Sequence, residues 1–158
     1  MVSQDSPVTS RTTSTDVPYS AAQMFDLVAD VEKYPEFLPW CIALRILDRD
    51  VSEAGGKLRA EMIVSYKVFR ERFKSDVALD PANKEIDVHY LDGPFRRLHN
   101  QWRFEDKPDG GSTIHFFIAF EFRNIVLQST ARVVFEKAFA RMSEAFVDRA
   151  DDLYGGAQ

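Results

Sequence analysis

The chain has 158 residues, of which 45% are hydrophobic and 28% are charged, and its formal net charge is −5. This length supports one domain with a core of its own. The acidic balance argues against a DNA- or RNA-binding protein, since such proteins usually carry a basic surface. One cysteine, Cys41, cannot form an internal disulfide and fits a reducing compartment.

The first residues, MVSQDSPVTSRTTSTD, lack the apolar stretch of a signal peptide. Nowhere does the sequence contain the 18 or so successive apolar residues that a membrane-spanning helix needs. We therefore expect a soluble, cytoplasmic protein with a flexible N-terminus (1–9), a single domain (10–150) and a C-terminal tail (151–158).

Weak alternation over 10–16 predicts an edge strand, and a helix follows it. Ser20 and Gln23 have the spacing of a capping box. Apolar residues recur at helical spacing from Ala21 to Val28. Asp30 can cap a second short helical turn, which the two prolines of the next segment keep short.

From residue 42 to 122 the apolar period changes to two, and Gly, Pro, Asp and Asn clusters mark the turns. The short gaps predict hairpins, hence an antiparallel meander. Its strands are expected at 42–52, 57–67, 69–79, 84–91, 95–106 and 112–123.

After Asn124 the helical period returns and runs to about Ala150. Its apolar stripe consists of Leu127, Ala131, Phe135, Ala138, Met142, Phe146 and Leu153, with Phe139 and Ala145 at the margins. This order of elements predicts an α+β fold in which the last helix covers one face of a curved sheet.

Alternation also sorts the strand residues by face. The face toward the helix is rich in aromatic and aliphatic side chains, but it also holds Tyr66, Glu71, Ser75 and Asn100. One interpretation is a close-packed core. The other is a cavity with polar anchors, because polar groups facing an apolar interior need partners. Composition does not distinguish the two.

The segment YPEFLPW (34–40) places apolar side chains between two prolines. Pro35 can open a short helical turn and Pro39 can end it, because each ring fixes φ. Tyr34, Phe37, Leu38 and Trp40 either plug one end of the sheet or form a mouth that faces a ligand or a membrane.

Two stretches resemble a known family. FDLVADVEKYPEFLPWC (25–41) and LDGPFRRLHNQWRF (91–104) are similar to coenzyme Q-binding proteins of the START-like superfamily. That superfamily is also described as polyketide cyclase/dehydrase-like (SRPBCC), and it includes a bacterial ribosome-association toxin. The resemblance spans about 10–150. It implies a helix-grip fold, in which about seven antiparallel strands wrap a long C-terminal helix around an apolar tunnel, with two short helices after the first strand.

The resemblance further implies a non-enzymatic carrier or chaperone that binds ubiquinone or a similar lipid and supports respiratory electron transport. Such a protein needs no metal or redox cofactor, and it contacts a membrane surface transiently, peripheral at the inner membrane. We expect Glu71, Asn100 and Tyr66 as polar anchors. The expected tunnel walls are Tyr34, Phe37, Leu38, Trp40, Met62, Val64, Phe73, Trp102, Phe104, Phe116, Ile118, Phe120, Phe135, Phe139 and Met142.

Two other functions stay open. A toxin-like module would block ribosomal subunit association. The negative net charge argues against direct contact with RNA, but a basic stripe leaves this function open, namely Lys67, Arg70, Arg72 and Lys74. A polyketide cyclase or dehydratase would use Glu71, Tyr66 and Asn100 as acid–base groups. We favour a structural role for Glu71, paired with an arginine or at a wet strand end, because perturbed carboxylates also occur in plain ion pairs.

The three histidines are not expected to bind a metal ion. His89, His99 and His115 all map to outward faces of their strands, and Cys41 is remote from them in sequence. No pair of these residues has the spacing of a zinc motif.

Overall fold

The computed structural model describes residues 8–66 and 69–155. Strands and helices follow in the order expected from the sequence. They are β1 (Thr9–Val17), α1 (Ala21–Ala29), the 3₁₀ turn η1 (Val31–Lys33), α2 (Tyr34–Phe37), β2 (Cys41–Ser52), β3 (Gly55–Tyr66), β4 (Phe69–Asp80), β5 (Glu85–Asp92), β6 (Phe95–Asp106), β7 (Ser112–Phe122), α3 (Ile125–Ala150) and the π-helical turn η2 (Asp151–Gly155).

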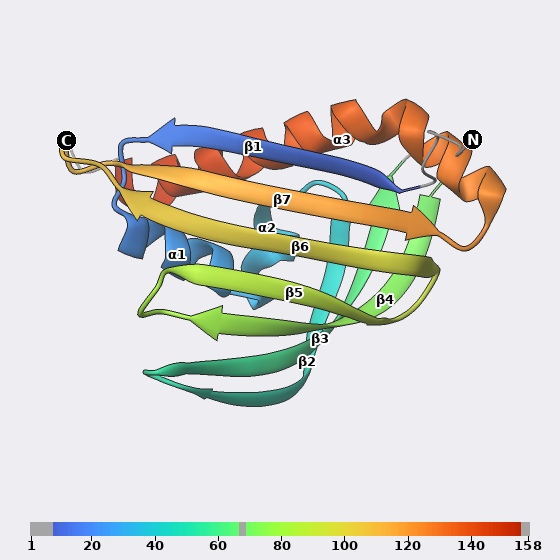
Figure 1. The fold of residues 1–158 in the computed structure, drawn as a ribbon, viewed down its shortest axis with the longest axis horizontal. Helices are drawn as coiled ribbons and strands as arrows, with labels where there is room; N and C mark the ends of the chain where they lie inside the picture. The colour runs from blue at the N-terminus through green and yellow to red at the C-terminus, as the bar shows by residue number, and fades with distance from the viewer. Residues whose placement is uncertain (1–7, 67–68, 156–158) are drawn as a thin grey trace, which may run out of the picture.

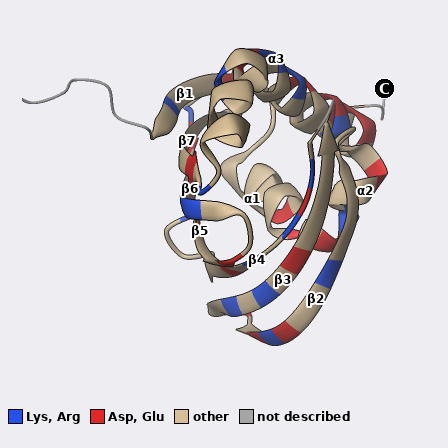
Figure 2. Cartoon of the chain, turned by 90° about the vertical axis from the view of Figure 1, so that its right-hand side faces the viewer, with Lys and Arg blue, Asp and Glu red and all other residues tan. Residues whose placement is uncertain are grey.

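All seven strands belong to one antiparallel sheet with the order β1-β7-β6-β5-β4-β3-β2. β2 to β7 form the predicted meander, and β1 joins it at the far edge, where Thr9 pairs with Phe120. The sheet curves from β1 round to β2, and α3 lies along its open side (Figures 1 and 2). The predicted α+β helix-grip fold is confirmed.

Local chemistry explains where the helices begin. Ser20 Oγ accepts a hydrogen bond from the backbone N–H of Gln23 at 3.1 Å, and Gln23 Oε1 accepts from the N–H of Ser20 at 2.9 Å. The predicted capping box is thus present. Asn124 caps α3, since its Oδ1 accepts from the N–H groups of Val126 and Leu127.

The turn between β5 and β6 contains Gly93, the first residue of the GPF motif. Its φ is +144°, and a Cβ atom there would lie 2.6 Å from the Cβ of Phe73 on β4. Only glycine therefore fits this close approach of the turn to β4. The motif thus has a structural reason, because it folds the hairpin against the strand that carries Phe73.

The end of α3 departs from the predicted stripe. Leu153, expected on the buried face, is 51% exposed. The reason is the π-helical turn η2, whose wider i→i+5 repeat changes the helical phase. Tyr154 lies inward instead: its ring packs 5.8 Å from Tyr19, and its hydroxyl donates to the carbonyl of Gln23. The first five residues of the expected tail are therefore helical.

The other terminal expectation is tested only in part. Residues 1–7, most of the segment expected to be flexible, lie outside the described residues, as does Lys67 of the basic stripe. Thr9, which we placed in the flexible segment, already belongs to β1. Its hydroxyl accepts a hydrogen bond at 3.0 Å from Nε2 of Gln128 on α3, which helps to fix it there.

Cys41 gives a prediction for pH dependence. It is 2% exposed at the start of β2, and burial raises the pKa of its thiol to about 11. A thiol with a raised pKa in the folded state stabilises the fold fully at low pH, and this contribution is lost as pH rises through the folded value. Between about pH 9 and pH 11 we expect the ionisation of this thiol to lower the free energy of unfolding by about 3 kcal/mol.

Urea unfolding of the wild type and of Cys41→Ala at several pH values measures this effect. All other ionisable groups are the same in both proteins, so the difference between the two pH slopes reports Cys41 together with its charge coupling to Tyr34. Equal slopes would contradict the raised pKa.

Candidate ligand-binding cavity

A cavity of about 280 Å³ lies between the concave face of the sheet and α3. This volume is near the lower end of the range for small-molecule sites, roughly 300–1,000 Å³. Most of the expected walls do line it, namely Tyr34, Leu38, Trp40, Met62, Val64, Phe73, Trp102, Phe116, Ile118, Phe120, Phe135 and Met142. Tyr66, Glu71, Ser75 and Asn100 line it as well. The aromatic face of the sheet therefore encloses a cavity and is not packed solid.

Three expected wall residues lie elsewhere. Phe37 packs edge-on against Phe146 of α3. Phe104 stacks on Trp102 and meets Phe25 of α1 edge-on. Phe139 contacts Phe116 and Phe135, but its ring lies under the guanidinium of Arg11. These side chains belong to the core that surrounds the cavity. Only Phe104 lies beyond the end of the cavity along its strand, two residues after Trp102. Phe37 and Phe139 lie between wall residues of their own segments, so they differ from their neighbours in the side of the segment that they occupy.

The segment 34–40 forms a packed end wall of the cavity. Leu38 is buried, and the ring of Tyr34 lies 5.5 Å from that of Phe146 on α3. The Tyr34 hydroxyl donates to the carbonyl of Val28 at 2.6 Å, and burial raises the pKa of this phenol above its ordinary value. Of the two interpretations of this segment, its packing therefore fits the plug.

Three polar atoms in the cavity walls are buried without a hydrogen-bond partner among the described residues. They are Nε1 of Trp40, Oγ of Ser75 and Oδ1 of Asn100. An unpaired buried polar atom costs about 1–3 kcal/mol. Natural proteins usually give such atoms a partner, either a bound water or a ligand.

These three atoms approach the cavity from different elements. Trp40 follows α2 at the end wall, whereas Ser75 on β4 pairs with Tyr90 and Asn100 on β6 pairs with Val88. The indole N–H is a donor, the hydroxyl is both donor and acceptor, and the amide offers an acceptor or, if its two ends exchange places, a donor. The cavity can thus hold an apolar molecule that carries a small group with both carbonyl and hydroxyl character.

Replacing Asn100 by leucine should separate stability from binding. The change removes a buried polar group of similar size, so we expect the free energy of unfolding to rise by about 1 kcal/mol. Affinity for a polar-headed apolar ligand should fall by about tenfold, because one hydrogen bond is lost. Thermal melting and ligand titration measure the two effects. A variant that loses stability would show that Asn100 already has a partner in the folded protein.

Glu71 lines the cavity, but the expected arginine partner is not found. No ion pair joins Glu71 to any residue in 8–66 or 69–155. It pairs across the sheet with Val64 of β3, near the end of the hairpin. Its position near the start of β4 leaves the other form of the expected structural role, a wet strand end.

Small wall residues were not expected from the sequence. Ala131 and Ala138 were placed on the buried stripe of α3, but they were not among the expected walls. Small side chains at a helix–sheet interface leave the space that a cavity needs. Trp40 was expected in the wall, but only as an apolar residue, so the polar role of its indole N–H was missed. The remaining wall residues not expected from sequence are Val31, Leu44, Ala60, Phe69, Val77, Ile86, Val88, Phe95, Leu98, Phe122, Val134 and Phe146.

The outer face of the sheet is charged. On β2 and β3 acidic and basic residues alternate, as Figure 2 shows. Arg45 pairs with Glu61 at 2.8 Å, and Arg59 pairs with Asp76 at 2.9 Å. Arg70 and Arg72 of the basic stripe are exposed, and Lys74 is half-buried. Among the helices described, none is long and apolar enough to cross a membrane.

Known proteins share this architecture. The family model for polyketide cyclase/dehydrase and lipid transport matches residues 17–147. The ribosome association toxin RatA of Pseudomonas aeruginosa is 35% identical over 139 residues, covering 88% of this chain and 93% of the toxin. The mitochondrial coenzyme Q-binding protein COQ10 homolog B of Xenopus laevis is 33% identical over 142 residues, covering 87% of this chain and 56% of that protein.

Solved structures agree with the sequence relatives. The solution structure of an 18 kDa protein from Caulobacter crescentus has a TM-score of 0.79 at 33% identity and covers 94% of this chain and 99% of its own. The Zhui aromatase/cyclase from Streptomyces has the same TM-score at 17% identity, covering 91% and 94%, which shows a shared fold. Because the family model spans most of the chain and the relatives match along the same length, the protein belongs to the polyketide cyclase/dehydrase and lipid transport family.

Proposed function

We propose that this protein is a non-enzymatic carrier that binds a polyprenyl quinone, or a similar lipid with a small polar head, in the cavity under α3. The observation that carries the proposal is the cavity itself, whose walls are apolar except for a few polar groups such as the unpaired atoms of Trp40, Ser75 and Asn100. The similarity to a coenzyme Q-binding protein of Xenopus laevis supports a quinone as the ligand.

The head group would lie among the polar atoms. The Trp40 N–H and the Ser75 hydroxyl can donate to quinone carbonyls, and the Asn100 oxygen can accept from a quinol hydroxyl. Each hydrogen bond would satisfy an atom that is otherwise buried and unpaired, so the gain is larger than for an exposed contact.

The tail would be held by desolvation. Burial of each CH₂ group contributes about 0.8 kcal/mol, whichever apolar residue it touches. A cavity of about 280 Å³ accommodates a head group and the first part of a tail. The rest of a long tail would stay outside, so transfer would take place at a membrane surface and a bilayer would compete for the ligand.

The two tryptophans provide the test, because both line the cavity. A quinone bound beside them should quench their fluorescence. Titration of the purified protein with a short-chain ubiquinone should therefore give saturable quenching with one quinone per chain, and the matching ligand without a quinone ring should bind without quenching. Linear, unsaturable quenching would contradict a defined site.

A second function is favoured by a different observation. Relatives named as the ribosome association toxin RatA are 33–36% identical to this chain and match 84–93% of their own length. By this similarity, the protein would bind a ribosomal subunit and block subunit association, with exposed arginines such as Arg70 and Arg72 contacting RNA.

Sedimentation distinguishes the two functions. Ribosomes from the protein's own host are centrifuged through a sucrose gradient with and without the purified protein. If it is a toxin of this kind, separate subunits should accumulate and the protein should sediment with one of them. Lipid extraction and native mass spectrometry of the same preparation would show whether a quinone is bound. Subunit accumulation without any bound quinone would overturn the carrier proposal.

A further inference from the structure

Two histidines face each other on the outer side of the sheet, away from the cavity. His89 on β5 is the direct cross-strand partner of His99 on β6. Their rings are stacked, with centroids 4.9 Å apart and planes 15° from parallel. The chain thus brings together two imidazoles that are ten residues apart in sequence, a pairing that only the register of β5 and β6 creates.

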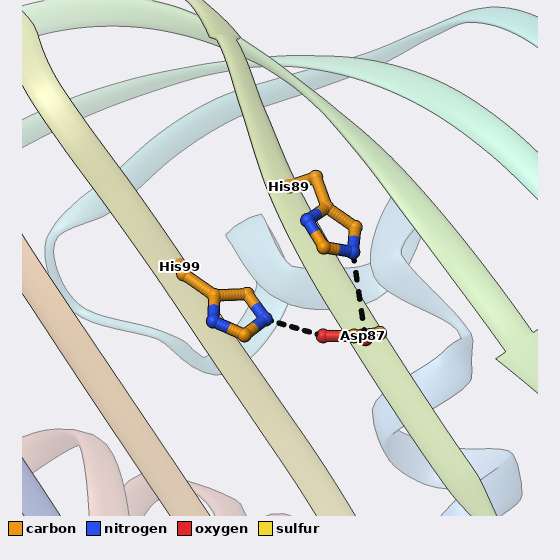
Figure 3. A group of neighbouring side chains, drawn as sticks. All are labelled: Asp87, His89 and His99. Carbon is orange, nitrogen blue, oxygen red and sulfur yellow. Dashed lines mark hydrogen bonds and ion pairs between the residues drawn. The ribbon is translucent and has the colours of Figure 1, made fainter.

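Asp87 completes the group, since it precedes His89 by two residues and lies on the same face of β5. One carboxylate oxygen is 2.6 Å from Nε2 of His99, and the other is 3.4 Å from Nε2 of His89. Figure 3 shows the two Nε2 atoms pointing toward this carboxylate from adjacent strands. All three potential ligand atoms lie within 4.8 Å of one another.

We propose that Asp87, His89 and His99 form a binding site for a divalent transition-metal ion, for which zinc is the best fit. Zinc prefers imidazole nitrogen and carboxylate oxygen at about 2.0–2.2 Å in a tetrahedron, so its ligand atoms lie about 3.3 Å apart. The observed spacings of 2.6 Å and 3.4 Å and the upper limit of 4.8 Å bracket that value. Three protein ligands leave the fourth position to water.

The surroundings favour a cation and leave the ligands accessible. The side chains of His89 and His99 are 59% and 39% exposed, so an ion can reach both from solvent. Asp76, which pairs with His89 from β4, adds negative charge nearby but is held by Arg59 at 2.9 Å. Asp76 therefore contributes to the field and not to the ligand set.

The place of the site in the sheet gives it a mechanical consequence. The β5–β6 ladder runs from Glu85↔Arg103 to His89↔His99, although β5 continues to Asp92 and β6 begins at Phe95. An ion bound to both histidines would therefore join the two strands at the last pair of their ladder. The next pair, Val88↔Asn100, lines the cavity on the other face. A bound ion would restrain the backbone that carries Asn100.

Calorimetric titration of the tag-free full-length protein with ZnCl₂ tests the site. We expect one ion per chain. His89→Gln and His99→Gln should each weaken binding by about tenfold or more, since loss of a ligand costs at least as much as loss of its supporting hydrogen bond. His115→Gln is the matched control, because His115 lies on the outer face of β7 and bonds Ser14 and Glu105 instead. It should bind zinc as the wild type does.

A second measurement needs no variant. Paramagnetic Ni²⁺ added to isotopically labelled wild-type protein should broaden the amide signals around His89 and His99 before those around His115. Equal broadening at all three histidines, no zinc binding at micromolar concentration, or a His115→Gln variant as weak as His99→Gln would each overturn the proposal. Asp87, His89 and His99 would then be a plain hydrogen-bonded group on the surface.

Discussion

Phenylalanine in place of Ala138 is expected to abolish quinone binding while the protein stays folded. Ala138 is half-buried on α3, and its methyl group faces the cavity. A phenyl ring there would occupy a large part of a space of about 280 Å³ that a ligand would otherwise fill. We expect affinity to fall by about 100-fold or more, which corresponds to about 2.7 kcal/mol.

The same fluorescence titration measures this loss, and Ala140→Phe is its matched control. Ala140 lies two residues further along the same helix and is exposed, so the identical change there adds no atom to the cavity. Ala140→Phe should bind as the wild type does. Thermal melting checks that Ala138→Phe is folded, since overpacking usually costs about 1–3 kcal/mol. Equal binding by both variants would place the ligand outside this cavity.

The Ala138→Phe variant also separates the two proposed functions. A toxin that acts through its outer surface should dissociate ribosomes equally well with a filled cavity. If Ala138→Phe loses quinone binding and ribosome dissociation together, the two activities depend on one another. If it loses only quinone binding, then quinone binding and ribosome dissociation use different surfaces of the protein.

Truncation of Phe146 is expected to cause the largest loss of stability. This residue on α3 is buried, and its ring contacts Tyr34 at 5.5 Å, Phe37 at 5.2 Å and Trp102 at 5.1 Å. It therefore joins the helix, the 34–40 segment and the sheet at one point. Replacement of a buried phenylalanine by alanine costs about 3–5 kcal/mol, because it removes apolar contacts and leaves a void.

Urea unfolding of Phe146→Ala against the wild type gives this number. Val133→Ala serves as the control, because Val133 is on the same helix but is 81% exposed. Its free energy of unfolding should change by about 0.5 kcal/mol at most. A loss below about 1 kcal/mol for Phe146→Ala would mean that the end wall does not depend on α3.

The sequence predicted the elements of this fold well, for identifiable reasons. Most strands are bounded by Gly, Pro, Asp or Asn residues, although none of these lies between Tyr66 and Phe69. The side chains also alternate, so both the span and the inner face of a strand could be predicted. The boundaries of β6 were predicted to the residue, and those of β2 and β7 to within one. Ser20 and Asn124 marked the helix starts because their side chains cap free N–H groups.

The walls of the cavity could be predicted only in part. Alternation tells which face a strand residue occupies, but not where along the strand the cavity ends, and so Phe104 was included. Phe37 and Phe139 lie on helical segments, where apolar character alone does not tell a wall residue from a neighbour that packs beside the cavity. Leu153 was placed by a regular helical period that a π-helical turn interrupts. The His89–His99 pair depends on the register between two strands, which neither residue's neighbours reveal.

The pairing of β1 with β7 has a consequence for how the protein folds. The first strand, β1, pairs with the last strand, β7. The β1–β7 ladder can therefore form only after the chain has been made as far as Phe120, the partner of Thr9. Such non-local contacts slow folding, because the chain loses the entropy of closing a long loop before any of these contacts stabilises it. During synthesis the aromatic face of the meander stays uncovered until α3 emerges. We therefore expect slow refolding with strong dependence on chaperones or on a hydrophobic ligand that covers this face early.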